Sequence, residues 1–282
     1  MFVIPAPNSV AFSIFGIPIY KYGIVMALAI FVAMVLANYF YNISNSEEKT
    51  FRKDVIYEFA PLIIVAGILG ARIYFCMLNP HYYLTHVIEI LDIRQGGLSI
   101  HGAIIGGGLG LWLVSLKTKI PFFAVIDTLS GSMFAGQAIG RWGNYFNSEA
   151  FGLPVAGQNW GLFIPEASRP VQYADYSLFH PAFLYESCLD ILGFAVMYFI
   201  VRRFGKTCKG MTFFTYLMLY SLIRFFVEQI RVDSALNIGI IPVAQIVSVI
   251  MFFAGLCGVV YLLLKRKPFL HCIAFDPLSK TS

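Results

Sequence analysis

The chain has 282 residues, of which 59% are hydrophobic and only 12% are charged, and its mean hydropathy is +0.75. Soluble domains carry about 45–50% apolar and about 25% charged residues, so these proportions exclude an ordinary soluble domain and indicate a membrane protein. The formal net charge of +5 does not favour a nucleic-acid partner, because the basic residues follow the pattern expected of membrane topology.

Seven apolar segments are long enough to cross a hydrocarbon core about 30 Å thick, which requires about 20 residues of helix. They cover residues 18–41, 56–78, 98–116, 121–140, 183–201, 210–231 and 239–264. The sequence therefore predicts an all-α integral membrane protein that forms one polytopic domain over residues 1–282. The connection between the fourth and fifth spans is too long for a tight turn, so we expect residues 145–180 to form a small external subdomain.

Lysine and arginine are concentrated in alternate connections of this predicted bundle. Most of them follow the first, third, fifth and seventh spans. By the positive-inside rule, the N-terminus is predicted to lie outside and the C-terminus in the cytoplasm.

With this orientation, ionisable and polar side chains from several spans converge on the outer leaflet. They are Tyr22, Arg72, His101, Arg141, Asn144, His180, Glu186, Arg224, Glu228 and Arg231, whereas Asp127 is the exception on the inner side. A charged group deep in a bilayer costs about 2.5–3.5 kcal/mol on insertion scales, so this concentration predicts a polar cavity with a function. The alternative for any single arginine near a helix end is that it snorkels to the lipid headgroups.

The segment RQGGLSIHGAIIGGGLG, residues 94–110, places His101 at the start of the third span. The later glycines of this segment predict close helix packing. A lone histidine is more often structural, but the position of His101 beside Gly96 and Gly97 favours a functional role, since backbone amides there could approach a ligand.

The segment GRWGNYFNSEAFG, residues 140–152, places Arg141 and Asn144 three residues apart. If the helix continues that far, a guanidinium and an amide share one face, which suits recognition of a phosphate. The alternative is a helix C-terminus, with Arg141 opposing the dipole and Gly143 and Asn144 ending the helix.

The sixth span carries Tyr220, Arg224, Glu228 and Arg231 on one helical face. Arg224 and Glu228 form an i,i+4 pair, which is as consistent with structure as with function. Arg231 would then be left with an excess positive charge available to an anion.

The start of the fifth span, HPAFLYES, contains His180, Pro181 and Glu186. A proline and an acidic residue in the first turns are typical of a helix start, so structural roles are favoured here. The sequence contains no metal-ligand spacing, nucleophile elbow or phosphate-binding loop motif, and we expect neither a metal nor another cofactor.

Taken together, these segments resemble the prolipoprotein diacylglyceryl transferase family. The family's signature motif is matched by the segment GRWGNYFNSEAFG. Its other motifs are matched by GGLSIHG, HPAFLYE, YSLIRFFVEQIR, the initial KYG and DTLSGSMFAGQAIGR. The agreement keeps the order of the motifs over nearly the whole chain. Tyr145 stands where the signature usually has Phe, and Ala103 follows Gly102 where a second glycine is common.

The resemblance implies transfer of a diacylglyceryl group from phosphatidylglycerol to the cysteine thiol of a lipobox in the signal peptide of a preprolipoprotein. A thioether forms and glycerol phosphate is released, as the first step of bacterial lipoprotein maturation. The partners would be membrane lipid and this signal peptide, in the bacterial inner membrane with the site facing the outer leaflet. The nucleophile would belong to the substrate.

We expect His101, Arg141 and Arg224 to act in catalysis, with His101 either as the general base for the thiol or as a hydrogen-bond donor. Substrate binding is assigned to Tyr22, Gly97, Gly102, Asn144, Glu149, Tyr220, Glu228 and Arg231, with Glu149 and Glu228 expected to orient arginines. The competing functions are a transporter or channel for an anionic solute, which needs polar groups through both halves of the membrane, and a lipid-binding scaffold.

Overall fold

The computed structural model describes residues 2–47, 51–92, 96–232, 237–238 and 241–265. Seven of its helices are long and apolar enough to cross a membrane. They are α1 (Lys21–Asn45), α2 (Val55–Leu78), α4 (Ile100–Thr118), α5 (Phe122–Asn147), α6 (Ala182–Phe204), α7 (Met211–Glu228) and α8 (Val243–Lys265). The predicted fold class is therefore confirmed.

The boundaries of two helices differ from the expected spans in a way that matters for the site. α5 continues past residue 140 to Asn147, and α7 ends at Glu228 rather than at residue 231. The expected boundaries were placed where the sequence ceases to be apolar. A helix is defined by its backbone hydrogen bonds, which can continue through polar residues, so the two kinds of boundary need not coincide. Arg141 and Asn144 are therefore helical, and Arg231 follows its helix.

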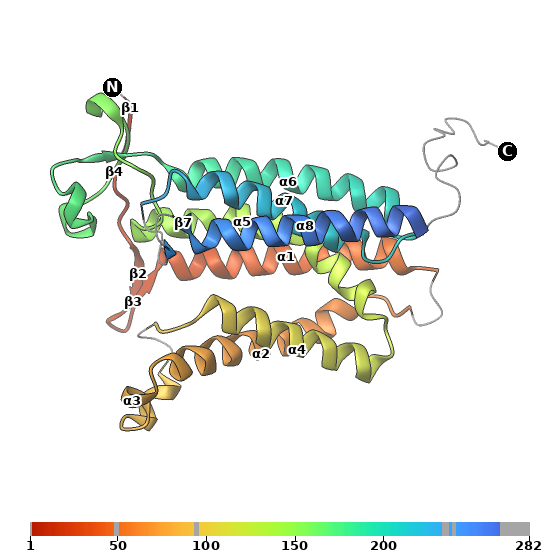
Figure 1. The fold of residues 1–282 in the computed structure, drawn as a ribbon. Coiled ribbons are helices and arrows are strands. Elements are labelled where there is room, and N and C mark those ends of the chain that lie inside the picture. Colours follow the sequence, from red (N-terminus) through yellow and green to blue (C-terminus); the bar gives the residue numbers. More distant parts are fainter. Residues whose placement is uncertain (1, 48–50, 93–95, 233–236, 239–240, 266–282) are drawn as a thin grey trace.

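One group of helices lies side by side in a bundle, in the upper part of Figure 1, and consists of α1, α5, α6, α7 and α8. α5 packs against α1, α6 and α7, and α8 covers α7. Successive helices run in opposite directions, so α1, α4 and α6 begin at the same end of the molecule at which α2, α5 and α7 finish (Figure 1). We call this end, which also carries the strands β1–β5, the strand end.

α2 and α4 form a separate pair below the bundle (Figure 1). Their contact is made by glycine, because a Cβ atom added to Gly70, Gly102 or Gly106 would collide with backbone atoms of the other helix. Gly107 and Gly108 face open space instead. The prediction of close packing by glycines thus holds for only part of the glycine run.

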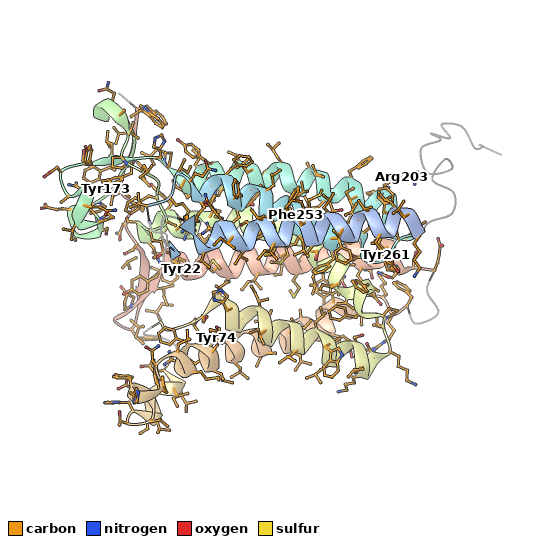
Figure 2. The ribbon with its side chains drawn as sticks, viewed as in Figure 1. Tyr22, Tyr74, Tyr173, Arg203, Phe253 and Tyr261 are labelled. Atoms are coloured by element: carbon orange, nitrogen blue, oxygen red, sulfur yellow. The ribbon has the colours of Figure 1, made fainter. Side chains whose placement is uncertain are left out.

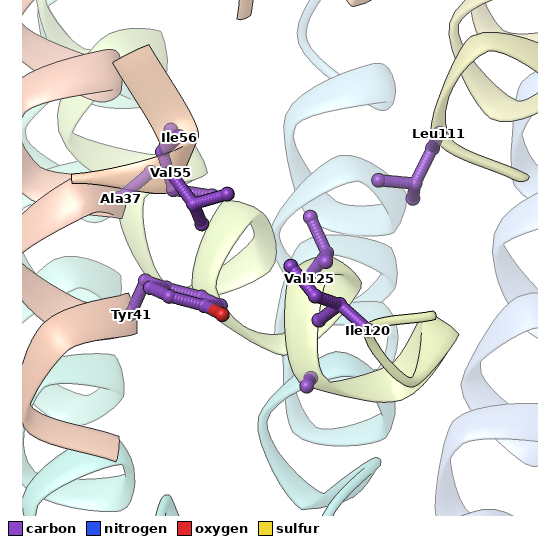
Figure 3. Close-up of a cluster of buried hydrophobic side chains, with 8 residues drawn as sticks. Ala37, Tyr41, Val55, Ile56, Leu111, Ile120 and Val125 are labelled. Carbon is purple, nitrogen blue, oxygen red and sulfur yellow. The ribbon is translucent and has the colours of Figure 1, made fainter. Parts of the chain in front are cut away.

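The pair joins the bundle at the end opposite the strands, through a cluster of buried apolar side chains (Figure 3). This cluster contains Ala37, Tyr41, Val55, Ile56, Leu111, Ile120, Ala124 and Val125. It brings together α1, α2, α4 and α5 and the short connections between them, and it fixes the pair to the bundle.

The strand end is built from short elements around the beginning of α1 and the connection between α5 and α6. β1 (Phe2–Ile4) pairs in parallel with β4 (Trp160–Phe163), which pairs in antiparallel with β5 (Leu178–Phe179). β2 (Val10–Ile14) and β3 (Ile17–Tyr20) form a hairpin that leads into α1. A small core of Phe151, Leu162, Ile164, Phe179 and Phe183 holds this region together.

Candidate active site

Polar side chains from α5, α6 and the end of α7 meet at the strand end of the bundle. Arg141 on α5 forms an ion pair with Glu186 on α6, with 2.8 Å between Nη1 and Oε2. The other oxygen of Glu186 accepts a hydrogen bond from Nη1 of Arg231 at 3.4 Å. Glu186 is only 2% exposed, and a buried carboxylate requires such compensation. One carboxylate therefore joins two arginines from different parts of the chain.

A second carboxylate lies one turn deeper on the same helix. Asp190 is 1% exposed, and its Oδ2 lies 3.6 Å from Nε of Arg141. Neither of these two atoms has a hydrogen-bond partner. No role was predicted for Asp190, and Glu186 was expected to belong to the start of a helix. Two acidic residues four positions apart in an otherwise apolar span were the signal that could have found both.

Arg224 and Glu228 pair on α7 as their spacing predicts. Nη2 of Arg224 lies 2.5 Å from Oε2 of Glu228. On the same helix the Tyr220 ring stacks on Tyr216, whose hydroxyl accepts a hydrogen bond from Gln137 of α5 at 3.0 Å. Glu228 thus contacts an arginine as expected, and Tyr220 lies one turn before Arg224 on the same helical face.

The arginines of the site are balanced by acidic groups. Arg141, Arg224 and Arg231 each lie beside one or more of the buried carboxylates Glu186, Asp190 and Glu228. The expectation that Arg231 carries an excess positive charge is therefore wrong, because it shares Glu186 with Arg141. The spacing within one helix could not reveal this, since Glu186 comes from another helix.

Asn144 and Glu149 contact each other at the end of α5. The amide of Asn144 donates to Oε1 of Glu149 at 3.2 Å, and the amide of Asn147 lies 3.5 Å from the same oxygen. Glu149 therefore orients amides, and the expected contact between Glu149 and an arginine is not found among the described residues. The interpretation of Gly143 and Asn144 as a helix end is also wrong, because α5 continues beyond them.

The missing side chain of Gly143 makes room for Tyr22. A Cβ atom at Gly143 would lie 3.0 Å from the Tyr22 ring, so the start of α1 packs closely on α5. Figure 2 shows Tyr22 at the strand end of the bundle, far from Arg203 at the opposite end. Tyr22, Arg141 and Asn144 are thus near the same end, as predicted.

The loop that follows α5 ties α6 and α7 together through its backbone. Gly152 donates to the carbonyl of His180, and Leu153 donates to the carbonyl of Ile230, each at 2.8 Å. A Cβ atom at Gly152 would lie 2.7 Å from Cβ of His180 and 3.0 Å from the Ile230 carbonyl. Only glycine fits here without movement, and the loop sets the position of Arg231 beside the start of α6. Gly152 is a further residue that the assignment of site residues missed.

His101 lies on the α2–α4 pair and not beside Arg141, Arg224 and Arg231, which we call the arginine cluster. It is exposed at the start of α4, and its ring lies 6.1 Å from that of Tyr74. No contact joins it to Arg141 or Arg224 in the described part of the chain. The structure places these groups at the same end of the molecule but does not bring them together.

The loop before His101 is organised by Arg72. This buried guanidinium donates to the backbone carbonyls of Glu89, Ile90, Asp92, Gly96 and Gly97, and it lies over the rings of Phe75 and Tyr83. Gly97 passes so close to Arg72 that a side chain would collide with it, and Gly102 packs against α2. Gly97 and Gly102 therefore have packing roles in this structure.

Asp127, the predicted exception, is explained by the start of α7 at the opposite end. Its carboxylate accepts hydrogen bonds from the backbone N–H groups of Gly210 at 2.6 Å and Phe213 at 2.8 Å. The first N–H groups of a helix have no partner within the helix, so a buried acceptor here satisfies them. Asp127 is structural in this position.

The arrangement at the strand end suits recognition of an anion next to apolar groups. Arginine offers five N–H donors in a planar fork, so donors remain after one or two carboxylates have been bound. Arg141 and Arg224 are about a fifth exposed, whereas their carboxylate partners are buried. The accessible donors lie on apolar helices long enough to span a membrane.

Comparison with known proteins shows the family of the chain. Residues 9–261 match the family model described as prolipoprotein diacylglyceryl transferase. A phosphatidylglycerol–prolipoprotein diacylglyceryl transferase of Acaryochloris marina is 37% identical over 266 residues, 94% of either chain. One from Trichormus variabilis is 36% identical over 95% of this chain and 94% of its own. One from Thermotoga maritima is 44% identical over 75% of this chain and 72% of its own. The chain belongs to the prolipoprotein diacylglyceryl transferase family.

Proposed function

We propose that the arginine cluster at the strand end binds the phosphate of phosphatidylglycerol and stabilises the glycerol phosphate that leaves. The chain is a phosphatidylglycerol–prolipoprotein diacylglyceryl transferase, and its reaction is the first step of lipoprotein maturation. The observation that carries the assignment is the meeting of Arg141 and Arg231 at one buried carboxylate, close to a helix end.

The chemistry places its main demand on the phosphate. The substrate thiol loses its proton, its sulfur bonds to the glyceryl carbon, and the bond from that carbon to the phosphate oxygen breaks. The oxygen keeps the electron pair, so a phosphodiester with one negative charge becomes a phosphomonoester that takes up a second. Guanidinium donors fixed in a site of low dielectric stabilise this developing charge. Arg141 and Arg224 are assigned to this role, with Asn144 as an additional donor.

The nucleophile is the cysteine of the lipobox in the signal peptide of the protein substrate, and His101 is assigned as the group that accepts its proton. Reference pKa values are about 8.5 for a thiol and about 6.5 for histidine, a mismatch of about 2.7 kcal/mol. The carboxylates beside the arginines weaken the positive field that would offset this mismatch. The arginines alone therefore do not favour the thiolate strongly, and the base role depends on close contact between His101 and the thiol when both substrates are bound.

The remaining assignments concern the surroundings of the site. The pattern of lysine and arginine supports an outer location for the strand end in the bacterial cytoplasmic membrane. Substrate binding is assigned to Tyr22, Tyr220, Glu149, Glu228 and Arg231, to Gly97 in the loop before α4, and to Gly102 in the first turn of α4. The whole chain is proposed to act as one polytopic domain, with membrane lipid and the signal peptide as partners and no nucleic acid.

A transfer assay tests the assignment directly. The purified protein is incubated with vesicles containing phosphatidylglycerol labelled in the diacylglyceryl part and with a synthetic lipobox peptide. We expect label on the peptide cysteine, and Arg141→Gln should reduce kcat/KM for the lipid by about 100-fold or more, the range for loss of a charge-stabilising donor. Unchanged kinetics in Arg141→Gln would refute the phosphate assignment. Lipid binding without transfer by the wild-type protein would indicate a scaffold instead.

A further inference from the structure

The presence of two buried carboxylates beside Arg141 needs an explanation. Glu186, at 2.8 Å, already supplies a full ion-pair partner for this arginine. Burying a second carboxylate carries a large desolvation cost, and an ion pair without a hydrogen bond repays only part of it. Oδ2 of Asp190 forms an ion pair with Nε of Arg141 at 3.6 Å, and neither of these two atoms has a partner at hydrogen-bond distance. An arrangement that served stability alone would contain an apolar residue at this position.

The two carboxylates define the orientation of the guanidinium group. Glu186 lies at Nη1 and Asp190 lies toward Nε, so two of the three nitrogens face α6. Nη2 has no hydrogen-bond or ion-pair partner within the described residues. A planar guanidinium with a carboxylate beside two of its nitrogens favours one orientation, which also sets the direction of its third nitrogen.

The position of α6 makes this arrangement rigid. Ser187 of α6 donates to the carbonyl of Ala138 on α5 at 2.8 Å, which fixes the two helices to each other beside the acidic residues. The ring of Phe134 on α5 lies against Gly193 one turn farther along α6. Asp190 therefore stands at a fixed distance from the backbone that carries Arg141.

We propose that Asp190 is a positioning residue for Arg141, and that it acts on the reaction by holding the guanidinium group so that Nη2 faces the lipid phosphate. The inference rests on the proposed function, since it assumes that Arg141 binds this phosphate. Asp190 lies deeper than Arg141 on the strand-end side of the bundle and has no direct contact with the lipid in this scheme. Its effect passes entirely through Arg141.

The test is a double-mutant cycle in the full-length protein, with phosphatidylglycerol vesicles and the lipobox peptide as substrates. Asp190→Asn keeps the shape and removes the charge, and we expect kcat/KM for phosphatidylglycerol to fall about 10- to 100-fold, the scale of a misplacement of about 1 Å. The KM for the peptide should not change. In the Arg141→Gln background, Asp190→Asn should cause little further loss, because the group on which it acts is gone. Asp190→Glu, which keeps the charge, should retain more activity than Asp190→Asn.

Asp127→Asn is the matched control, since Asp127 is a buried aspartate at the opposite end that binds the start of α7. It should lower the Tm and leave kcat/KM of the folded protein unchanged. Wild-type kinetics in Asp190→Asn beside impaired Arg141→Gln would overturn the role of Asp190 alone, as would additive losses in the cycle. Unchanged kinetics in Arg141→Gln would overturn the proposed function itself. Unfolding of Asp190→Asn, together with losses of Tm and kcat/KM that run in parallel in Asp190→Glu, would assign a structural role and also overturn the inference.

Discussion

Arg141, Arg224 and Arg231 at the strand end are each held by a carboxylate from a helix. Glu186 takes donors from Arg141 and Arg231, and Glu228 takes one from Arg224. In a membrane an uncompensated arginine is costly to bury, whereas a paired one can be placed at a defined depth and still keep free donors. At the scale of the residue, the carboxylates allow the arginines to be present at the proposed phosphate site.

Replacing His101 by Gln separates its two possible roles. Glutamine keeps a hydrogen-bond donor and cannot accept a proton at neutral pH. If His101 is the base, kcat/KM should fall by about 100-fold or more, the usual contribution of general base catalysis. The remaining activity should rise with pH as the thiol ionises by itself, which the transfer assay at pH 6 to 9 would measure.

His86→Gln is the control for this experiment, because His86 is an exposed histidine of the same loop region whose ring stacks on Tyr82. It should behave as wild type. Near-normal activity of His101→Gln at every pH would exclude the base role and leave His101 as a donor.

The site could be predicted from the sequence only as far as each residue carries its own signal. Arg141, Arg224 and His101 stood out because ionisable groups in apolar helices are rare. Asp190 carried the same signal, but its contact with Arg141 could not be predicted, because Arg141 is 49 positions earlier in the chain and no local spacing connects them. Contacts between helices are decided by packing, which the pattern within one helix does not contain.

At the scale of the element, the loop after α5 is as important as the helices it joins. Gly152→Ala would place a Cβ atom against both His180 and the backbone of Ile230, and overpacking of this kind costs about 1–3 kcal/mol. The ends of α6 and α7 would separate, and with them Glu186 and Arg231. We expect kcat/KM to fall at least 10-fold with a modest decrease in Tm, measured by the transfer assay and by thermal unfolding.

Gly108→Ala provides the comparison, since a Cβ atom at Gly108 has no neighbour within 4 Å. It should leave both measurements near wild type. Wild-type kinetics in Gly152→Ala would mean that the loop does not set the position of Arg231.

The α2–α4 pair permits a test of helix packing within a single turn. Gly106 and Gly107 are adjacent, but a side chain at Gly106 would meet the backbone of α2, whereas one at Gly107 would meet nothing. Gly106→Val should lower the Tm substantially, by the cost of forcing the two helices apart. Gly107→Val should change it little, and equal effects of the two substitutions would contradict the observed face of α4.

At the scale of the whole molecule, the bundle and the α2–α4 pair are joined at the end opposite the strands. Besides the apolar cluster, Asp54 accepts hydrogen bonds from the amides of Asn38 at 2.7 Å and Asn42 at 3.1 Å. These bonds, that of Asn38 first, hold the pKa of Asp54 below its ordinary value of 3.8. A lowered pKa stabilises the folded state above the ordinary value, and the stabilisation is lost as the pH falls through the lower value of the folded state.

Asp54→Asn should therefore have a lower Tm than wild type at neutral pH, and the difference should disappear as the pH is lowered below about 3.8, the ordinary pKa of the group. Thermal unfolding in detergent at a series of pH values measures this. Glu166→Gln, at an exposed acidic position of the strand end, serves as the control. A difference that persists undiminished in acid would show that the charge of Asp54 does not contribute to the junction.

The number and order of membrane helices followed from the sequence, because a run of about 20 apolar residues is a strong signal. The division into a bundle and a pair did not. It depends on which glycines face a neighbouring helix. Gly106 and Gly107 are the same residue type, but only Gly106 faces α2. The extension of α5 to Asn147 could not be predicted with certainty either. Polar residues end the hydrophobic run there, but the helix continues because Arg141 is paired with Glu186.

The pairing of Arg141 with carboxylates of α6 also bears on how the protein enters the membrane while it is being synthesised. α5 leaves the ribosome first, and its arginine has no acidic partner until α6 follows with Glu186 and Asp190. Two helices whose charges are unfavourable separately become more acceptable to lipid once these charges are paired, and Arg231 adds the remaining positive charge when α7 has followed. α5 and α6 are therefore expected to leave the translocation channel together, and the assembly of the reaction centre begins before the chain is complete.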